Sequence, residues 1–244
     1  MKGIDYSWAR PGGAAITAAG FDFVMRYVPY PGDGSKGLTV EEIADLRSNG
    51  LGIGLVFENT AGRALDGYAA GRADAQQYTR SMLALGYPVD LPCFFAIDFD
   101  AQPDQYEQIG DYFSGAIVVL GIKRVGAYGH DRILDFLWGN GLIKWAWQTY
   151  AWSGGRLYPY RNLLQYSNGE TLNGGAVDYN EANGNGAGWL WEEDDMATNA
   201  EQAVQLEAYA KRLALIALLT DKGDNGYAAT LEFYDSAKAN GWVA

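Results

Sequence analysis

The chain has 244 residues, enough for one large domain or for one domain with an appendage. Its net charge of −12 argues against nucleic acid or an anionic membrane surface as the main partner. One cysteine, Cys93, cannot form an intrachain disulfide, and one histidine, His130, cannot build a metal site of several histidines. No apolar run approaches the roughly 18–20 residues of a bilayer-spanning helix, and the amino terminus lacks the basic, apolar leader of a signal peptide.

Strand-like and helix-like runs alternate from the first residue. The strands are short apolar runs bounded by turn residues, and the helices show apolar positions at helical spacing. In the first half the predicted order is a strand at 2–6, a helix at 13–19, a strand at 23–28, a loop at 29–37, a helix from Thr39 to before Gly50, a strand at 52–57 and a helix at 66–85. These strands carry Asp5, Arg26 and Glu58 at or near their ends.

The next strand, which begins at Cys93, is the most informative stretch of the chain. Five mostly apolar residues run directly into Asp98 and Asp100, a pattern that predicts a strand buried on both faces. Because side chains alternate along a strand, we expect both carboxylates to point in the same direction. Two neighbouring like charges at the end of a buried strand are typical of a site that handles protons or sugars. The alternative is that one carboxylate caps the following helix and the other is solvated.

The second half continues the alternation with weaker helices. The predicted order is a helix at 103–120, a strand at 124–128, a helix at 131–137, and strands at 144–150, 162–167 and 176–180. Eight strands, with helices clear in the first half and reduced to loops in the second, predict an α/β fold of the TIM-like (β/α)8 barrel type. An open doubly wound sheet is disfavoured because no glycine-rich phosphate fingerprint follows the first strand.

We expect two parts, the barrel at 1–190 and a helical carboxyl-terminal extension at 191–244. The extension shows helical patterns at 199–219 and 227–240, which are too little for an independent core. These two helices are therefore expected to pack on the barrel, to dock a protein partner or to self-associate.

In a barrel of this kind the chemistry lies at the carboxyl ends of the strands. The polar residues expected there are Asp5, Arg26, Glu58, Asp98, Asp100, Tyr128, Gln148, Gln165 and Asp178. Together they predict an acidic pocket with aromatic rings at its rim. Crowded carboxylates raise one another's pKa, so one carboxyl is expected to stay protonated near neutral pH. Such a pocket suits glycoside cleavage, which needs a proton donor for the leaving oxygen and a carboxylate facing the oxocarbenium-like centre.

Some of these residues have purely structural alternatives. Asp5 and Arg26 could form only an ion pair between adjacent strands. Trp145 and Trp147 point to the same face and could belong to the core or form a sugar platform. His130 could touch substrate, although a place at the surface or at a helix start is favoured. Many carboxylates could bind a divalent cation, yet no calcium-loop spacing is present, so we expect no metal and no other cofactor.

Four segments resemble a known family. They are Gly-Ile-Asp-Tyr-Ser at 3–7, Tyr-Ala-Ala-Gly-Arg-Ala-Asp-Ala at 68–75, Phe-Ala-Ile-Asp-Phe-Asp at 95–100, and the two strands that carry Gln165 and Asp178. They are similar to the Rv2525c-type glycoside hydrolase-like domain family, formerly called DUF1906, which is related to the family 25 lysozymes, or Chalaropsis-type muramidases. The resemblance covers roughly residues 1–190 and implies a TIM-barrel glycosidase fold with peptidoglycan or a related cell-wall glycan as substrate. Members occur in actinobacteria and their phages, often within lysins or virion proteins.

The resemblance also implies roles for individual residues. Family 25 lysozymes have an early Asp, matched by Asp5, and an Asp-x-Glu motif at the fourth strand, which here reads Asp98-Phe99-Asp100. The Glu that donates the proton in the lysozymes is therefore an Asp in this chain. Glu58, on the neighbouring strand, could supply the missing reach.

We therefore predict a cell-wall glycan hydrolase of the lysozyme or endolysin type. Asp100 or Glu58 is the expected general acid, and Asp98 is the carboxylate expected to face the anomeric carbon. The other predicted site residues orient water or contact the sugar: Asp5, Arg26, Tyr128, Trp147, Gln148, Gln165 and Asp178. Two alternatives stay open, a non-catalytic glycan-binding module and a virion component whose carboxyl-terminal helices dock a partner. Without a signal peptide, the protein is expected to reach the cell wall by another secretion route, by phage delivery or as part of a virion.

Overall fold

The computed structural model describes residues 1–88, 90–184, 186 and 188–191. The chain divides into two compact units, Met1–Met196 and Ala197–Ala244, and all described residues belong to the first unit. The two helices predicted at 199–219 and 227–240 lie outside the described residues. The extension and the boundary at 190/191 therefore stay predictions.

The first unit is a closed barrel of eight strands arranged in sequence order. The strands are β1 (Lys2–Asp5), β2 (Phe23–Tyr27), β3 (Gly52–Phe57), β4 (Cys93–Ala96), β5 (Val125–Gly129), β6 (Trp145–Thr149), β7 (Leu163–Leu172) and β8 (Gly175–Ala182). Neighbouring strands from β1 to β7 run parallel. The predicted TIM-like α/β barrel is confirmed, and each predicted strand overlaps an observed one.

The last strand departs from an all-parallel barrel. Strand β8 is antiparallel to both β7 and β1. The reason lies in the turn Asn173-Gly174, where both residues adopt positive φ (46° and 79°). An Asn-Gly pair of this conformation closes a tight hairpin, whereas a parallel return would need a crossover of a dozen residues or more. The two strands therefore form a hairpin that extends β7 to residue 172, beyond the predicted end at 167.

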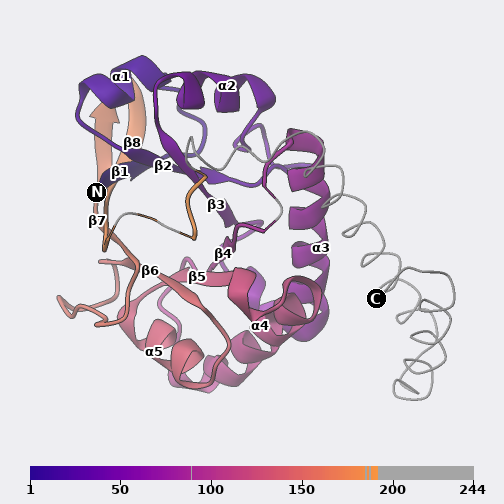
Figure 1. Cartoon of the computed structure of the whole chain (residues 1–244). Coiled ribbons are helices and arrows are strands. Elements are labelled where there is room, and N and C mark those ends of the chain that lie inside the picture. The colour runs from indigo at the N-terminus through magenta and orange to yellow at the C-terminus, as the bar shows by residue number, and fades with distance from the viewer. Residues whose placement is uncertain (89, 185, 187, 192–244) are drawn as a thin grey trace, which may run out of the picture. The chain divides into compact units, whose positions relative to one another are not determined.

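A helix follows each of the strands β1 to β5, and no described helix follows β6, β7 or β8. The helices are α1 (Gly13–Ala18), α2 (Val40–Ser48), α3 (Gly67–Leu85), α4 (Tyr106–Leu120) and α5 (Asp131–Gly139). In Figure 1, α1 and α2 lie at the top, α3 at the right, and α4 and α5 below, while β7 lies at the left without a helix outside it. This arrangement confirms the predicted loss of helices in the second half. Among the described helices, none is both long and apolar enough to span a bilayer.

Local sequence signals set the ends of several helices. Thr39 caps α2, since its side chain accepts the backbone N–H of Glu42 (3.2 Å). Gly86 ends α3 in the left-handed conformation, at φ 65°. His130 caps α5 by accepting the N–H of Ile133 (3.4 Å) and is fully buried. The favoured placement of His130 at a helix start is confirmed, but at a buried rather than an exposed position.

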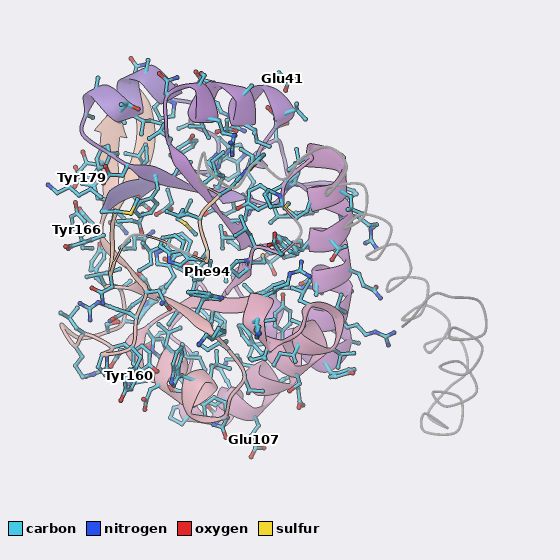
Figure 2. The ribbon with its side chains drawn as sticks, in the orientation of Figure 1. Glu41, Phe94, Glu107, Tyr160, Tyr166 and Tyr179 are labelled. Atoms are coloured by element: carbon cyan, nitrogen blue, oxygen red, sulfur yellow. The ribbon has the colours of Figure 1, made fainter. Side chains whose placement is uncertain are left out.

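The barrel interior is filled with large apolar side chains. The interior cluster contains Phe23, Met25, Val56, Phe94, Ala96, Tyr128, Trp147, Leu163, Ala182, Trp189 and Leu190. Phe94 lies at its centre in Figure 2 and meets the rings of Trp147 and Trp189 edge-on, at centroid distances of 6.0 Å. Trp145 also packs against this cluster, so the prediction that both strand tryptophans share a face is confirmed.

Residues 189–191 complete the barrel unit. Trp189 and Leu190 belong to the interior cluster, and the backbone of Trp191 pairs with Ile53 of β3. The ring of Trp191 packs edge-on against Tyr87 at 5.0 Å. Burial of three consecutive large apolar residues indicates that the end of the described segment is a structural part of the barrel.

Helices α3 and α4 approach closely because glycines face each other's backbone. A Cβ atom on Gly71 would lie 1.8 Å from the Tyr112 carbonyl oxygen, and one on Gly115 would lie 2.1 Å from that of Tyr68. The backbones of the two helices are too close to leave room for a Cβ atom at either position, so this packing of α3 against α4 requires both glycines.

Gly71→Ala is expected to force the two helices apart and to lower the free energy of unfolding by about 1–3 kcal/mol. Gly139→Ala is the matched control, because a Cβ at that helical position meets nothing within 4 Å. Urea unfolding followed by circular dichroism measures both. Equal stability of the two variants would contradict the close packing.

Candidate active site

A cavity of about 310 Å³ opens at the carboxyl ends of the parallel strands. It is lined by Asp5, Tyr27, Val56, Glu58, Ala96, Asp98, Tyr128, Trp147, Thr149, Ala151, Trp152, Gln165, Asn168 and Asp178. Seven of the ten predicted site residues are among them, contributed by five strands and by the segments that follow two others. The barrel thus brings together side chains up to 173 positions apart, from Asp5 to Asp178.

Hydrogen bonds connect the deepest polar residues of the cavity. Gln165 Nε2 donates to Asp5 Oδ2 (2.9 Å) and to Asp178 Oδ2 (3.3 Å). Gln165 Oε1 accepts the hydroxyls of Tyr128 (2.8 Å) and Thr149 (3.1 Å). Both ends of the Gln165 amide are therefore engaged, which holds the carboxyls of β1 and β8 at one place.

A second branch of this network bonds the same carboxylate oxygen of Asp5. Asn180 Nδ2 donates to Asp5 Oδ2 (2.7 Å), and Trp147 Nε1 donates to Asn180 Oδ1 (2.9 Å). Asp5 is 5% exposed, and Asn180 and Gln165 are equally buried. Burial is the largest cause that raises the pKa of Asp5, from an ordinary 3.8 to about 7, and the neighbouring Asp178 adds to it. The predicted protonation of one crowded carboxyl near neutral pH agrees with this direction.

Asp5→Asn is expected to remove a pH dependence of stability. Between pH 4 and 7 the folded protein binds a proton at Asp5 that the unfolded chain has released, so this carboxyl makes the native state less stable as pH rises. Between about pH 5.5 and 8 the wild type should lose on the order of 2 kcal/mol relative to the variant. Urea unfolding of both proteins at the two pH values measures the difference, and parallel stability curves would contradict the assignment.

Glu58, Asp98 and Asp178 are the more accessible carboxylates of the cavity. Burial raises the pKa of Asp98 most, the charges of Glu58 and Asp178 raise it further, and Lys36 lowers it. The pKa of Asp178 is also raised by burial, against a lowering by the Gly169 N–H that donates to its Oδ1 (2.9 Å). The surroundings therefore raise the pKa of both Asp98 and Asp178 above the ordinary value of an aspartate.

Lys36 brings a cation to the cavity wall from the loop after β2. Its Nζ lies 3.6 Å from Glu58 Oε2 and 4.5 Å from the centroid of the Tyr27 ring. The side chain is largely buried, so this ion pair is shielded from bulk water. Among the described residues, no three His, Cys, Asp or Glu side chains converge in a way that could hold a metal ion.

Arg26 does not reach the cavity. It is fully buried, and its Nε and Nη2 donate to the two carboxylate oxygens of Glu42 on α2 (2.7 and 3.2 Å). Phe23, Met25 and Tyr27 of the same strand face the interior, so Arg26 points to the helix layer. The structure does not bring Arg26 to the cavity with the other predicted site residues, and the observed ion-pair partner of Arg26 is Glu42 rather than Asp5.

Gln148 also points away from the cavity. Its Nε2 donates to Ser153 Oγ (3.1 Å) and to the Arg156 carbonyl oxygen (2.7 Å), and its Oε1 accepts the N–H of Tyr158 (2.8 Å). The inward positions of β6 are Trp147 and Thr149, on either side of it. The structure therefore does not bring Gln148 to the cavity with the other predicted site residues; its side chain holds the loop that follows β6.

Asp98 and Asp100 do not point in the same direction. Strand β4 ends at Ala96, and a tight turn follows in which the Ala101 N–H donates to the Phe99 carbonyl oxygen (2.9 Å). Asp98 lines the cavity, whereas Asp100 is half exposed and pairs with Arg132 at 3.1 Å. The strand alternation holds for Phe94, Ala96 and Asp98 but does not reach Asp100, so the predicted shared direction is wrong.

The residues in or next to the cavity lining include six that were not predicted from the sequence. These are Tyr27, Lys36, Thr149, Trp152, Asn168 and Asn180, which line the cavity or contact its lining. Strand parity could have found two of them, since Tyr27 and Thr149 lie two positions from interior residues of their strands. Lys36 and Trp152 lie on loops, where no periodic signal exists.

A closed barrel with carboxylates gathered at the carboxyl ends of its strands is the arrangement of a glycoside hydrolase-like protein. Residues 14–207 match the family described as Rv2525c-like, glycoside hydrolase-like domain. The chain belongs to this family, and the resemblance found in the four sequence segments is confirmed.

Individual relatives agree with this assignment. "Putative peptidoglycan hydrolase Rv2525c" of Mycobacterium tuberculosis is 30% identical over 190 residues, which cover 73% of this chain and 79% of that protein. The crystal structure of the Tat-secreted protein Rv2525c in complex with L-tartrate aligns with a TM-score of 0.72 and 28% identity, over 77% of this chain and 97% of that one. A bacterial lysozyme from Streptomyces coelicolor shares the fold, with a TM-score of 0.53 and 18% identity over 78% and 94% of the two chains.

Proposed function

We propose that this protein is a cell-wall glycan hydrolase of the lysozyme type, which cleaves the β-1,4 bonds of peptidoglycan. The observation that carries the proposal is the cavity, which gathers Glu58, Asp98 and Asp178 where a barrel enzyme places its chemistry. Glycoside hydrolysis needs two carboxyl groups, one protonated and one ionised, on either side of the scissile bond. Family membership and the relative named as a peptidoglycan hydrolase support the substrate class.

Asp98 is the proposed proton donor, and Glu58 is the carboxylate that faces the anomeric carbon. The surroundings of Asp98 raise its pKa, as a general acid requires. Glu58 has the ammonium of Lys36 beside it, a suitable partner for an ionised carboxylate. These roles are the reverse of those expected from the sequence. Asp100, the other expected donor, has no place in the proposed mechanism because it does not line the cavity.

Asp178 and Asp5 are proposed to orient the substrate from the far wall. Gln165 donates to both carboxyls and fixes their position, while Tyr128 holds Gln165 from the other side. Asp5 lies deepest, so its proposed role is electrostatic, and Asp178 is the better placed to touch an N-acetyl group or a water molecule. Trp147 contributes a ring to the cavity floor.

Lys36→Met is expected to move the basic limb of the pH–rate profile to higher pH. Lys36 lowers the pKa of Asp98, so removing the cation lets Asp98 keep its proton at higher pH. The measurement is kcat/KM on peptidoglycan as a function of pH, with Lys36→Arg as the variant that retains the charge. A basic limb that stays in place, or moves to lower pH, would contradict Asp98 as the donor.

A second candidate function is glycan binding without cleavage. The observation that favours it is Asp100, which occupies the motif position of the lysozyme proton donor but pairs with Arg132 outside the cavity. Purified protein incubated with actinobacterial cell walls distinguishes the two functions. Release of new reducing ends supports hydrolysis, whereas tight binding of the walls without release supports the binding module.

We propose that this protein acts at the cell wall. Its relative Rv2525c is a Tat-secreted protein, and that description concerns the relative. The phage-borne or virion-associated route stays a prediction.

A further inference from the structure

Trp152 adopts a backbone conformation that a bulky residue rarely takes. Its φ is +57°, in the left-handed region, where a Cβ atom crowds the following carbonyl oxygen. The same turn uses glycine at its other positive-φ positions, Gly154 and Gly155 (φ 57° and 77°). A tryptophan thus stands in the turn where glycine would be the less strained choice.

The turn is held from below by a buried hydrogen-bond network. Ser153 is 1% exposed, and its Oγ donates to the Thr149 carbonyl oxygen (2.8 Å) while accepting from Gln148 and from the backbone N–H of Asp131. Thr149 Oγ1 accepts the N–H of Ala151 (3.2 Å). With bonds on both sides of it, Trp152 is kept in the strained conformation by its surroundings.

Two further contacts hold the turn, one to α5 and one to the β7–β8 hairpin. Arg156 Nε pairs with Asp131 Oδ2 on α5 (2.6 Å), which fastens the far end of the turn. Tyr150 OH donates to Asn168 Oδ1 (2.8 Å), which connects the turn to the β7–β8 hairpin on the other side of the cavity. The turn is therefore tied to the barrel wall and to the hairpin.

The supported turn presents the indole of Trp152 at the cavity mouth. Trp152 lines the cavity and is 39% exposed, whereas Trp147 on the floor is 2% exposed. A rigid, half-exposed ring above an acidic cavity offers an apolar face and an indole N–H to a ligand. An uncharged pyranose ring suits this position, because its C–H face packs on aromatic rings while its hydroxyls bond carboxylates.

We propose that Trp152 is a stacking platform that binds one sugar ring of the glycan substrate beside the cleavage site. The proposal rests on the proposed glycan function and assigns it a specific binding residue. Gln148 and Ser153 are positioning residues in this proposal. Their side chains hydrogen-bond within the turn from outside the cavity and thereby hold Trp152 in place.

The test uses the full chain in an Asp98→Asn background, so that bound glycan is not cleaved. The probe is a tetrasaccharide of alternating N-acetylglucosamine and N-acetylmuramic acid, with Kd measured by calorimetry. Trp152→Gly should raise Kd by about tenfold, and Trp152→Phe should stay within about threefold. Tyr160→Ala is the matched control, because this ring is 61% exposed on the same loop but stacks on Trp138 of α5. Tyr160 lies at the lower left of Figure 2, below Tyr166 and Tyr179 of the hairpin.

A thermal melt separates the binding role from a structural one. Because glycine relieves the positive φ, Trp152→Gly should melt at the same temperature as its parent or higher. If the parent binds the glycan and Trp152→Gly binds it equally well, the platform is overturned while the proposed function stands. If Trp152→Gly binds more weakly only because it melts at a much lower temperature, the platform is likewise overturned. If the parent itself does not bind, the proposed function fails and the platform fails with it.

Discussion

Asp98→Asn is expected to lower the rate of peptidoglycan hydrolysis by about 10²–10⁴-fold, the usual contribution of a positioned general acid. Asp98 lines the cavity beside Glu58, and burial together with the charges of Glu58 and Asp178 raises its pKa. An amide at this position cannot deliver a proton to the leaving oxygen. The measurement is kcat/KM for release of reducing ends from purified cell walls.

Asp100→Asn is the control for this prediction. The residue belongs to the same Asp-x-Asp motif, but its carboxylate pairs with Arg132 and does not line the cavity. The Asp100→Asn variant should keep most of the wild-type kcat/KM, and it should melt near the wild-type temperature because an exposed ion pair contributes little to stability. A loss of activity in Asp100→Asn as large as in Asp98→Asn would overturn the assignment of the donor.

Glu42→Ala is expected to lower the free energy of unfolding by about 3–5 kcal/mol, the usual cost of leaving a buried charge without its partner. Glu42 accepts hydrogen bonds from Arg26 and from the hydroxyl of Tyr6 (2.9 Å), and it pairs with Arg10 at 3.1 Å. The Arg26 side chain has no exposure to solvent and stacks over the Tyr6 ring at 4.2 Å. Guanidinium chloride unfolding measures the loss.

The double variant Arg26→Met/Glu42→Leu is the control. Removing both charges leaves no buried ion unpaired, so this protein should be more stable than Glu42→Ala alone. Its kcat/KM should stay far closer to wild type than that of Asp98→Asn, because Arg26 lies in the helix layer and not in the cavity. A double variant that folds well but has lost all activity would show that Arg26 contributes to the active site.

Much of the fold was predictable because its signals are local. The strand at 52–57 has the predicted bounds, since an apolar run between turn residues specifies a buried strand. The helix predicted at 66–85 is observed at Gly67–Leu85 and ends at a glycine in the left-handed conformation. The direction of β8 was not predicted, although the Asn173-Gly174 turn carried the signal for a hairpin.

The site was less predictable because neighbouring residues of a strand point in opposite directions, so an error of one position places a side chain on the wrong face. Arg26 and Tyr27 are neighbours at the end of β2, and only Tyr27 lines the cavity. Gln148 and Thr149 are related in the same way at the end of β6. In each pair the more conspicuous polar side chain faces outward, where it serves packing rather than the cavity.

The sequence by itself determined the barrel, the family and a cluster of carboxylates at the strand ends, because apolar periodicity and short motifs are carried by residues close together in the chain. Only the tertiary structure decided which carboxylates meet. The end of β4 at Ala96 separates Asp98 from Asp100, and loops bring Lys36 and Trp152 to the cavity. These outcomes depend on where strands stop and how loops are held, which is set by contacts between distant segments.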